Sequence, residues 1–243
     1  MRFDVLTLFP EMFTPVKESI LGRALDNNLI ELNLINFREF STDKSKHVDD
    51  TPYGGGAGMV IKPEPVYDAY KSIVEGLENK PKVIYLSPKG KVFNQKIARE
   101  LAKEEHLILL CGHYEGIDQR LIDEIVDEEI SIGDYVLTGG EIPAMVLIDS
   151  VSRYVEGVLN KDSIIDESFS NGLLEYPQYT KPENFEGEKV PEILLSGHHE
   201  KINRWRREKS LETTYKKRPE LLKKINLTNE DKKYLEVLEK GGK

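Results

Sequence analysis

Cysteine is almost absent from this sequence, since Cys111 is the only one among 243 residues. One thiol excludes a disulfide framework and a zinc site built from several thiolates, and it is typical of a reducing cytosol. Long apolar runs are absent as well, because no stretch approaches the roughly 18–20 residues that span a bilayer. The opening MRFDVLTLFPEMF carries an acid early and shows no signal-peptide pattern. We therefore expect a cytoplasmic protein without a membrane partner.

Positive charge is in short supply, with 34 Lys and Arg against 43 Asp and Glu and a net charge of −9. Taken alone, this balance argues against a nucleic-acid partner, because such proteins usually neutralise phosphates with Lys and Arg. The distribution is uneven, however. Residues 196–243 hold 14 basic and 8 acidic residues, a net of +6, whereas residues 1–195 hold 20 and 35, a net of −15. Two interpretations stay open: an ordinary solvated surface, or a basic tail that meets a polyanion.

Short apolar runs alternate with helical patterns over the first 160 residues. The β-branched run Lys82–Leu86 and the apolar run Leu107–Leu110 are typical of strands buried on both faces. Strands that alternate with helices indicate an α/β domain with a largely parallel sheet over residues 1–160. The other expected strands are Arg2–Leu8, Glu31–Phe37 and Glu129–Ile132, and the expected helices are Pro15–Asn27, Asn94–Lys103 and Glu141–Gly157.

The periodicity fails from Asn160 to about Pro191, where Pro, Gly, Glu and Lys accumulate. We interpret residues 161–191 as an interdomain linker or ordered loop rather than a packed element. Helical patterns follow at Gly197–Lys209, at Pro219–Ile225 and after Thr228, which suits an N-cap and precedes two acids. Residues 192–243 are therefore expected to form a small helical domain.

Standard nucleotide, metal and nucleophile motifs are missing. Lys89–Lys91 lacks the residues of a P-loop, the five histidines have no metal-ligand spacing, and no nucleophile elbow occurs. The segment Tyr53–Met59 is dense in glycine but does not match the dinucleotide pattern. Such density favours a loop whose backbone approaches a ligand closely, with an ordinary tight turn as the alternative.

Three of the expected strands end in loops of small or turn-forming residues, which contain Ser87–Pro88, Cys111–Gly116 and Gly133–Gly140. In open α/β sheets, ligands bind outside the carboxyl ends of the strands. Because these loops are rich in glycine and free of Lys and Arg, they suit a purine and a thioether better than a triphosphate. Three ordinary turns between strands and helices are the alternative.

Long motifs occur along almost the whole chain, from the first strand to at least Pro219. They are GGGAGMV, YLSP, CGHYEGIDQR, ISIGDYVLTGGEIPA, DSVSR, ESFSNGLLEYPQYTKP and LLSGHHEKINRWR, in that order. In these motifs the chain closely resembles the bacterial tRNA (guanine-N1)-methyltransferases, which modify the guanine immediately 3′ of the anticodon, position 37. That family belongs to the SPOUT class of S-adenosylmethionine-dependent enzymes. The resemblance implies a trefoil-knotted α/β fold and a homodimer whose active site is shared between subunits.

The resemblance also assigns the methyl donor, S-adenosylmethionine, to the three loops described above. Backbone groups in such loops can read an adenine edge, and glycine lets the main chain pack closely. The residues implied to form the donor site are Tyr85, Leu86, Ser87, Pro88, Gly112, Tyr114, Glu115, Gly116, Ser131, Ile132, Gly133, Asp134, Tyr135, Val136, Leu137, Gly139, Gly140 and Pro143.

Methylation of guanine N1 removes a proton while negative charge spreads onto O6, so the reaction requires a base and a nearby cation or donor. The family's arginine corresponds to Arg153, for which a helical ion pair with Asp149 is the alternative. The family's base is usually an aspartate, and this chain has Glu167 at that position, preceded by Asp166. We predict Glu167 as the base and keep Asp166 as the second candidate, with two solvated linker acids as the alternative.

The basic tail is the part implied to meet tRNA, and Trp205 is expected to be a core anchor there, three residues after Ile202. The family is associated with magnesium, although the sequence holds no dedicated metal motif. No DNA partner is expected. Two other functions stay open, namely methylation of a different RNA guanine and a non-catalytic RNA-binding module. The cations expected to contact phosphates are Arg204, Arg206, Arg207, Lys209, Lys216, Lys217 and Arg218.

Overall fold

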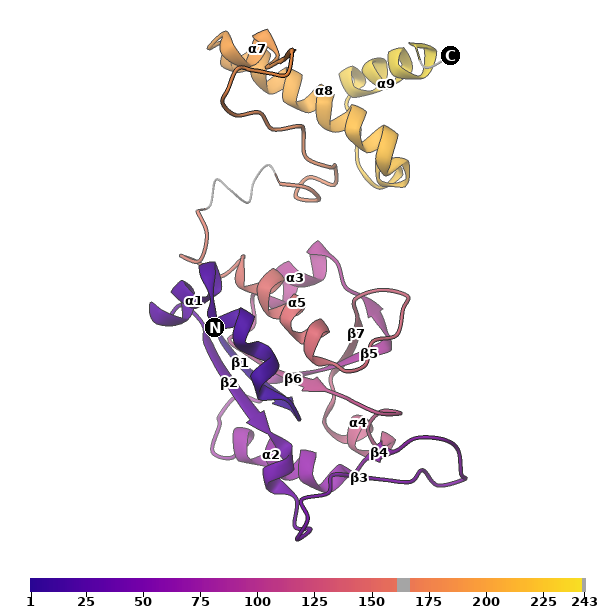
Figure 1. Ribbon diagram of the computed structural model, residues 1–243. Helices are drawn as coiled ribbons and strands as arrows, with labels where there is room; N and C mark the ends of the chain where they lie inside the picture. The colour runs from indigo at the N-terminus through magenta and orange to yellow at the C-terminus, as the bar shows by residue number, and fades with distance from the viewer. Residues whose placement is uncertain (161–166, 242–243) are drawn as a thin grey trace. The chain divides into compact units, whose positions relative to one another are not determined.

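The computed structural model describes residues 1–160 and 167–241, and the chain forms two compact units (Figure 1). The first unit is Met1–Leu159 and the second is Asn160–Lys243. Each unit has hydrophobic core residues of its own.

A five-stranded sheet with the order β2-β1-β6-β5-β7 forms the centre of the first unit. Every pairing in this sheet is parallel. The predicted α/β domain with a largely parallel sheet is therefore confirmed. The strands are β1 (Arg2–Thr7), β2 (Glu31–Asn36), β5 (Lys82–Val92), β6 (His106–Cys111) and β7 (Glu128–Ser131).

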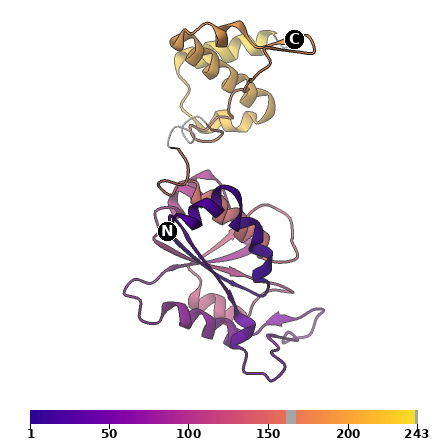
Figure 2. The same ribbon diagram turned by 60° about the vertical axis from the view of Figure 1, so that its left-hand side comes forward.

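Helices cover both faces of the sheet (Figure 2). Residues of η1, α1, α3 and α5 join the core cluster on one face, and residues of η2, α2 and α4 join the cluster on the other. A short antiparallel pair, β3 (Asp49–Asp50) with β4 (Val60–Ile61), flanks the glycine-rich loop. The bounds of the helices are η1 Pro10–Lys17, α1 Ser19–Asp26, η2 Phe37–Phe40, α2 Pro63–Val74, α3 Gln95–Leu101, α4 Gln119–Ile125 and α5 Glu141–Ser152.

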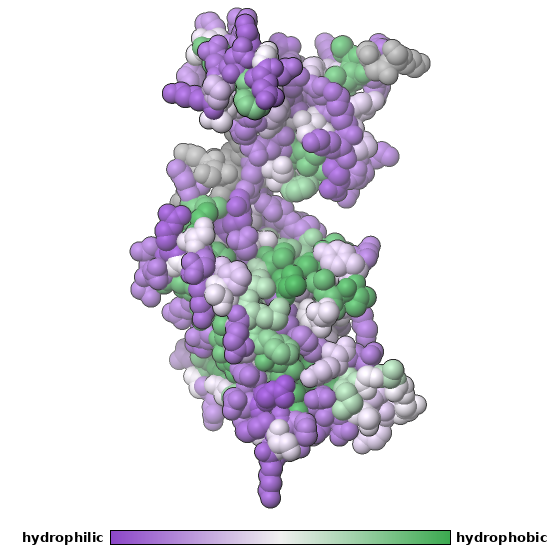
Figure 3. All heavy atoms as spheres, viewed as in Figure 1, coloured by the Kyte–Doolittle hydropathy of each residue, from purple (hydrophilic) through white to green (hydrophobic). Residues whose placement is uncertain are grey.

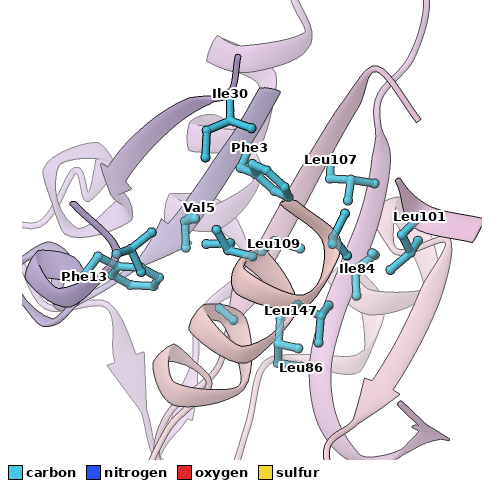
Figure 4. Close-up of a cluster of buried hydrophobic side chains, with 14 of the residues drawn as sticks. Phe3, Val5, Phe13, Ile30, Ile84, Leu86, Leu101, Leu107, Leu109 and Leu147 are labelled. Carbon is cyan, nitrogen blue, oxygen red and sulfur yellow. The ribbon is translucent and has the colours of Figure 1, made fainter. Parts of the chain in front are cut away.

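Burial on both faces explains the unbroken apolar runs of the central strands. Successive strand residues point to opposite faces of a sheet. Along β6, Leu107 and Leu109 therefore join the first cluster, whereas Ile108 and Leu110 join the second. Figure 4 shows the first cluster, in which side chains of the strands meet Leu147 of α5.

Two of the predicted elements of the first unit, β5 and α5, end more than two residues away from their predicted ends. Strand β5 runs to Val92 rather than Leu86, and Gly90 makes this extension possible. A Cβ at Gly90 would lie 2.3 Å from the carbonyl carbon of Glu129 in β7, so only glycine lets the two backbones come this close. Helix α5 ends at Ser152 rather than Gly157, because the chain then tightens into i to i−3 hydrogen bonds such as the 3.0 Å bond from the Tyr154 N–H to the Val151 carbonyl.

Two α-helices of the first unit, α2 and α4, were not among the sequence predictions. Helix α2 begins at Pro63 and carries a second proline at Pro65, which mask its amphipathic pattern. Helix α4 lies inside an acidic stretch, yet it buries Leu121, Ile122 and Ile125 against the second face of the sheet.

The second unit contains the predicted helices, and its longest helix extends further than predicted, to Lys217 instead of Lys209. Its core is small, built on Leu173, Leu211 and Leu235. The elements are a hairpin of β8 (Asn184–Phe185) and β9 (Glu188–Lys189), then α7 (Glu192–Leu195), α8 (His199–Lys217), η3 (Pro219–Lys224) and α9 (Asn229–Gly241).

The segment predicted as a linker or ordered loop contributes Leu173 to this core, so the expectation that it holds no packed residue is wrong for residues 167–191. Leu173 is 1% exposed and packs with Leu211 and Leu235. The Leu174 N–H donates a 2.9 Å hydrogen bond to Oγ1 of Thr214 in α8. One leucine in a stretch rich in Pro, Gly and charge creates no periodicity, so the sequence pattern does not reveal this packing.

Trp205 is not the core anchor that its spacing from Ile202 predicts. It is half-buried, lies outside the Leu173–Leu211–Leu235 cluster, and has its ring centroid 6.3 Å from that of Tyr179. The core contacts of α8 come from residues further along the helix, including Leu211 and Tyr215. In the described part of the chain, no helix combines the length and apolar character needed to cross a membrane.

Candidate functional site

A pocket with a volume of about 280 Å³ lies at the carboxyl ends of β6 and β7 and beside the middle of β5, where the pairing of β5 with β7 shifts register between Leu86 and Lys91. We call it the sheet-edge pocket. Residues inside β5, the segments that follow β6 and β7, and the start of α5 form its walls, and ligands of open parallel sheets bind at this carboxyl side of the strands. Its lining comprises Tyr85–Lys89, Gly112–Ile117, Gln119, Ile122, Ile130–Gly133, Tyr135–Gly140 and Pro143.

The structure brings together nearly all of the residues that the sequence assigns to a donor site. Seventeen of the eighteen line the sheet-edge pocket, and Asp134 is the exception among them. Lining residues that the sequence analysis missed include Lys89, His113, Gln119 and Ile122. His113 lies inside a motif that was recognised, whereas Gln119 and Ile122 depend on the unpredicted helix α4.

Glycines in the pocket wall are required by close approach of the backbone. At Gly140 a Cβ would lie 2.7 Å from Cα of Cys111, and at Gly112 it would lie 2.9 Å from the Tyr85 hydroxyl oxygen. The Gly140 N–H donates a 2.9 Å hydrogen bond to the Gly112 carbonyl, which joins the loop after β6 to the start of α5. Gly140 has a φ of −84°, an ordinary value, so its requirement is steric.

Tyr85 forms part of the pocket wall from within β5. Its side chain is buried, and burial followed by the nearby Glu129 carboxylate raises the pKa of Tyr85 to about 12. The phenol is therefore neutral at physiological pH, and it presents a ring face and a hydroxyl group. Burial also raises the pKa of the Cys111 thiol, with a further contribution from Glu141, which makes Cys111 a structural thiol rather than a nucleophile.

A buried polar network lies directly behind the pocket wall. Oγ1 of Thr7 donates a 2.7 Å hydrogen bond to Oε1 of Glu141, and Nε2 of His113 lies 2.6 Å from Oε2 of the same carboxylate. The Glu141 side chain is 1% exposed and that of His113 is 15% exposed. The network thus connects the ends of β1 and β6 with the first residue of α5.

The glycine-rich loop, Gly54–Gly58, lies next to the pocket loop that follows β6. The Glu115 N–H donates a 3.0 Å hydrogen bond to the Met59 carbonyl. Gly58 has a φ of +83°, and a Cβ there would lie 2.5 Å from Oε1 of Glu115. Tyr53, at the start of this loop, is fully exposed.

The residues predicted to carry the chemistry are divided between the two units. Arg153 caps α5 in the first unit and is half-buried. Glu167 is half-buried in the second unit, where its carbonyl accepts a 3.1 Å hydrogen bond from the Ser170 N–H. Asp166 lies outside the described residues. The roles of these three residues stay predictions.

An apolar surface covers the outer side of α5 and the start of η1. We call it the α5 surface and define it as Phe9, Met12, Ile142 and Val146, each 38–44% exposed. Figure 3 shows apolar residues gathered over α5 and the loop next to it. Residues 142, 146, 149 and 153 share one face of a helix, so Arg153 stands on the same side as Ile142 and Val146.

Across residues 1–160 and 167–241, no group of three or more His, Cys, Asp or Glu side chains is arranged to hold a metal ion. A magnesium site is therefore not identified among the side chains of the described residues.

The first unit is a parallel α/β domain, and its pocket lies on the carboxyl side of the strands, where open α/β sheets bind small ligands. The chain belongs to the tRNA (guanine-1)-methyltransferase family, because it matches the family described as "tRNA (Guanine-1)-methyltransferase TrmD" over residues 1–224. The resemblance inferred from the motifs is thereby confirmed. The trefoil knot of the SPOUT class stays a prediction.

Named relatives agree with this family over nearly their whole length. The tRNA (guanine-N(1)-)-methyltransferase of Ruminiclostridium cellulolyticum is 65% identical over 227 residues, 93% of this chain and 97% of that protein. The enzyme of the same name from Clostridium beijerinckii is 60% identical over 236 residues, 97% of this chain and 98% of that protein. The one from Clostridium botulinum strain Langeland is 58% identical over 241 residues, 99% of both chains.

Proposed function

We propose that this protein transfers a methyl group from S-adenosylmethionine to N1 of the guanine immediately 3′ of the anticodon, position 37, in tRNA. The family and the names of the relatives support this activity. The observation that carries the proposal is the convergence of seventeen residues, picked from separate sequence motifs, on one pocket beside β5 and the carboxyl ends of β6 and β7.

The chemistry of the sheet-edge pocket fits a nucleoside that carries a sulfonium group. Gly112 and Gly140 add no side chain of their own to the wall, and backbone N–H and C=O groups of the pocket loops can read an adenine edge. Leu86, Ile132 and Leu137 supply apolar walls. The Glu115 carboxylate supplies negative charge for a ligand with a positive sulfur and an ammonium group. When bound, the donor supplies an electrophilic methyl group.

In this proposal a carboxylate of the chain removes the guanine N1 proton while Arg153 stabilises the charge that develops on O6. Glu167 is the proposed base and Asp166 the second candidate. The assignment of Glu167 rests on its position in the Glu167–Phe169 motif, where the family usually has aspartate. A glutamate performs the same proton transfer with one additional methylene of reach.

The second unit is the proposed tRNA-binding part. Its cations are already engaged, because Arg204, Arg207, Lys209, Lys216 and Arg218 form ion pairs with acids of the same unit. Exposed pairs among these, such as Arg204–Glu208 and Arg218–Glu220, contribute only about 0–1 kcal/mol, so a phosphate can replace the carboxylate partner at small cost. Arg207 differs, because its partner Asp231 is only 5% exposed. Phosphate contacts of this type make tRNA affinity fall as salt rises.

We also propose that the protein acts as a homodimer through the α5 surface. A contiguous exposed apolar surface marks an interaction site, and a two-fold interface brings the same patch of both subunits together. Since Arg153 stands on the same helix face as Ile142 and Val146, an interface there would bring it close to the partner subunit. This arrangement supports an active site that is shared between subunits. The proposed compartment is the cytoplasm, where tRNA is found. Magnesium dependence stays a prediction, and no step of the proposed chemistry passes through a metal ion.

The proposal is tested by transfer of labelled methyl from S-adenosylmethionine to an unmodified tRNA with guanine at position 37. We expect turnover with this tRNA and none when position 37 is adenine. Transfer at another guanine would favour a different RNA site, and tRNA binding without transfer would favour the non-catalytic module.

The same assay separates the two candidate bases. We expect Glu167→Gln to reduce the rate by about 10²- to 10⁴-fold, the usual contribution of a general base, and Asp166→Asn to have a small effect. Wild-type turnover by Glu167→Gln would refute the assignment of the base.

A further inference from the structure

We propose that His113 is a positioning residue for the donor, through its contact with the buried Glu141. The inference rests on the proposed function of the sheet-edge pocket, and it assigns a role to a residue pair rather than to the pocket as a whole. His113 acts by holding the rim of the pocket in its binding geometry, and it is not proposed to react.

The pair belongs to a closed ring of contacts. Thr7 donates to Glu141 through its hydroxyl, and the same Oγ1 accepts a 2.9 Å hydrogen bond from the Phe9 N–H. The Phe9 ring packs on the imidazole of His113 with a centroid distance of 4.8 Å. His113 completes the ring through its 2.6 Å contact with Glu141. Each member therefore has its position determined by two others.

Gly139, a lining residue of the pocket, rests directly on this pair. A Cβ at Gly139 would lie 2.3 Å from Cε1 and Nε2 of His113 and 2.6 Å from Oε2 of Glu141. Gly139 and His113 also form an isolated antiparallel β-bridge. The two side chains therefore support the backbone at Gly139 directly, next to Gly140, whose N–H is bonded to the Gly112 carbonyl.

Loss of the pair would affect the donor more than it affects the fold. Breaking a buried hydrogen-bonded pair leaves one polar partner unsatisfied, and the nearby backbone shifts to admit water or a new partner. A displacement of about 1 Å at a binding site can reduce reactivity by about 10²-fold without removal of any contacting group. Because Gly139 and Gly140 line the proposed donor pocket, we expect a shift of their backbone to appear in donor affinity as well.

The chain offers a matched control at the other end of β6. Nε2 of His106 lies 2.6 Å from Oδ2 of Asp4, with side-chain exposures of 16% and 0%, nearly the values of the His113 pair. Asp4 is also held by Arg2 and Asn33. This second pair lies at the start of β6, whereas the pocket lies beyond its carboxyl end.

The experiment measures the dissociation constant of S-adenosylmethionine by calorimetry, together with the thermal unfolding midpoint, for the full-length protein and five variants. The variants are His113→Phe, His113→Gln, His106→Phe, Glu141→Gln and Asp4→Asn. Phenylalanine keeps the ring contact with Phe9 but removes the polar contact, and glutamine restores an N–H donor at similar reach.

We expect His113→Phe to weaken donor binding at least tenfold and His113→Gln to stay within about threefold of the wild type. We expect His106→Phe to lower the unfolding midpoint about as much as His113→Phe does, while its donor affinity is unchanged. Unchanged donor binding by His113→Phe would overturn the inference, and so would equal weakening by His113→Phe and His106→Phe.

If His113→Phe does not fold, the donor affinity of Glu141→Gln is compared with that of its control, Asp4→Asn. Weaker donor binding in Glu141→Gln alone supports the inference, and equal affinities in the two variants refute it. A wild-type protein that binds no S-adenosylmethionine would refute the proposed function instead, so the two failures are distinguishable.

Discussion

The glycines of the pocket wall show how single residues determine whether the site can form. Gly140 packs on the backbone of Cys111 with an ordinary φ, so any side chain at this position collides with main chain rather than with a flexible group. Backbone atoms of a buried strand cannot move aside without loss of sheet pairing.

We predict that Gly140→Ala destabilises the first unit by about 1–3 kcal/mol, the usual penalty of overpacking, and weakens donor binding at least tenfold. Calorimetric unfolding and donor titration would measure the two effects. The control is Gly76→Ala, where a φ of +81° introduces backbone strain but a Cβ has open space. We expect that variant to lose about 1 kcal/mol and to bind donor normally. Normal donor affinity in Gly140→Ala would contradict the steric argument.

A second residue-scale prediction concerns the phenol of Tyr85. Because its pKa is raised to about 12 in the folded state, the unfolded chain releases this proton near pH 10 while the folded chain retains it. The folded state then binds more protons, so stability falls as pH rises between about 10 and 12, by up to about 1.4 kcal/mol per pH unit.

Tyr85→Phe lacks this titration. The difference in unfolding free energy between wild type and variant should therefore stay constant from pH 7 to 9 and change in favour of the variant above pH 10. Urea unfolding at a series of pH values measures it, and a constant difference up to pH 11 would count against a neutral, buried phenol.

Among the elements, α9 shows how a short helix is fixed to its neighbour. As predicted, Thr228 caps it, since Oγ1 of Thr228 accepts a 3.1 Å hydrogen bond from the Asp231 N–H. The Asp231 carboxylate accepts a hydrogen bond from the Thr228 N–H at 2.9 Å, and two from Arg207 of α8 at 3.1 and 2.8 Å. The Arg207 hydrogen bond is the largest cause of the lowered pKa of Asp231.

We predict that Asp231→Asn destabilises the second unit by about 2 kcal/mol at neutral pH, because it weakens charge-assisted hydrogen bonds of a 5% exposed carboxylate. Since the folded pKa is depressed, this stability is present above the ordinary carboxyl pKa and is lost as pH falls through the folded value. Wild type and variant should therefore converge in acid. Trp205, the single tryptophan, reports unfolding of this unit by its fluorescence. The exposed pair Arg218–Glu220 provides the control, and Glu220→Gln should change stability by less than about 0.5 kcal/mol.

Elements with a complete local pattern were predictable, and elements shaped by neighbours were not. The run Leu107–Leu110 predicts β6 because both of its faces are buried, and periodicity is the direct trace of burial. The extension of β5 to Val92 depends on the approach of Gly90 to Glu129 across the sheet, which no local pattern records. The packing of Leu173 into the second unit depends in the same way on α8 and α9.

In the whole molecule, the site shows the same contrast between features with a local sequence pattern and features that depend on distant residues. The pocket loops were predictable, because short segments after buried strands meet at one edge of a parallel sheet and because their motifs are long. The Thr7–Glu141–His113 network was not, since it joins residues 134 and 28 positions apart. Only the fold brings the end of β1 beside the start of α5.

At the scale of the assembly, the α5 surface makes a prediction about oligomeric state. We expect Ile142→Asp to convert a dimer to a monomer and to reduce methyl transfer at least 100-fold, while the stability of the subunit changes little because the side chain is 44% exposed. Sedimentation equilibrium measures the mass. Val237→Asp changes an apolar residue of α9 that is 66% exposed, and it should leave both mass and activity unchanged. A dimeric Ile142→Asp protein would place the interface elsewhere.

The central claim is that the chain methylates N1 of guanine 37, and nucleoside analysis of the product tests it most directly. Wild-type protein is incubated with S-adenosylmethionine and an unmodified tRNA transcript, and the RNA is digested and separated by chromatography with mass detection. We predict one equivalent of 1-methylguanosine per tRNA, mapped to position 37 by partial digestion, and none with a transcript that carries adenine there. Methyl on the ribose, on another guanine atom or at another position would contradict the claim.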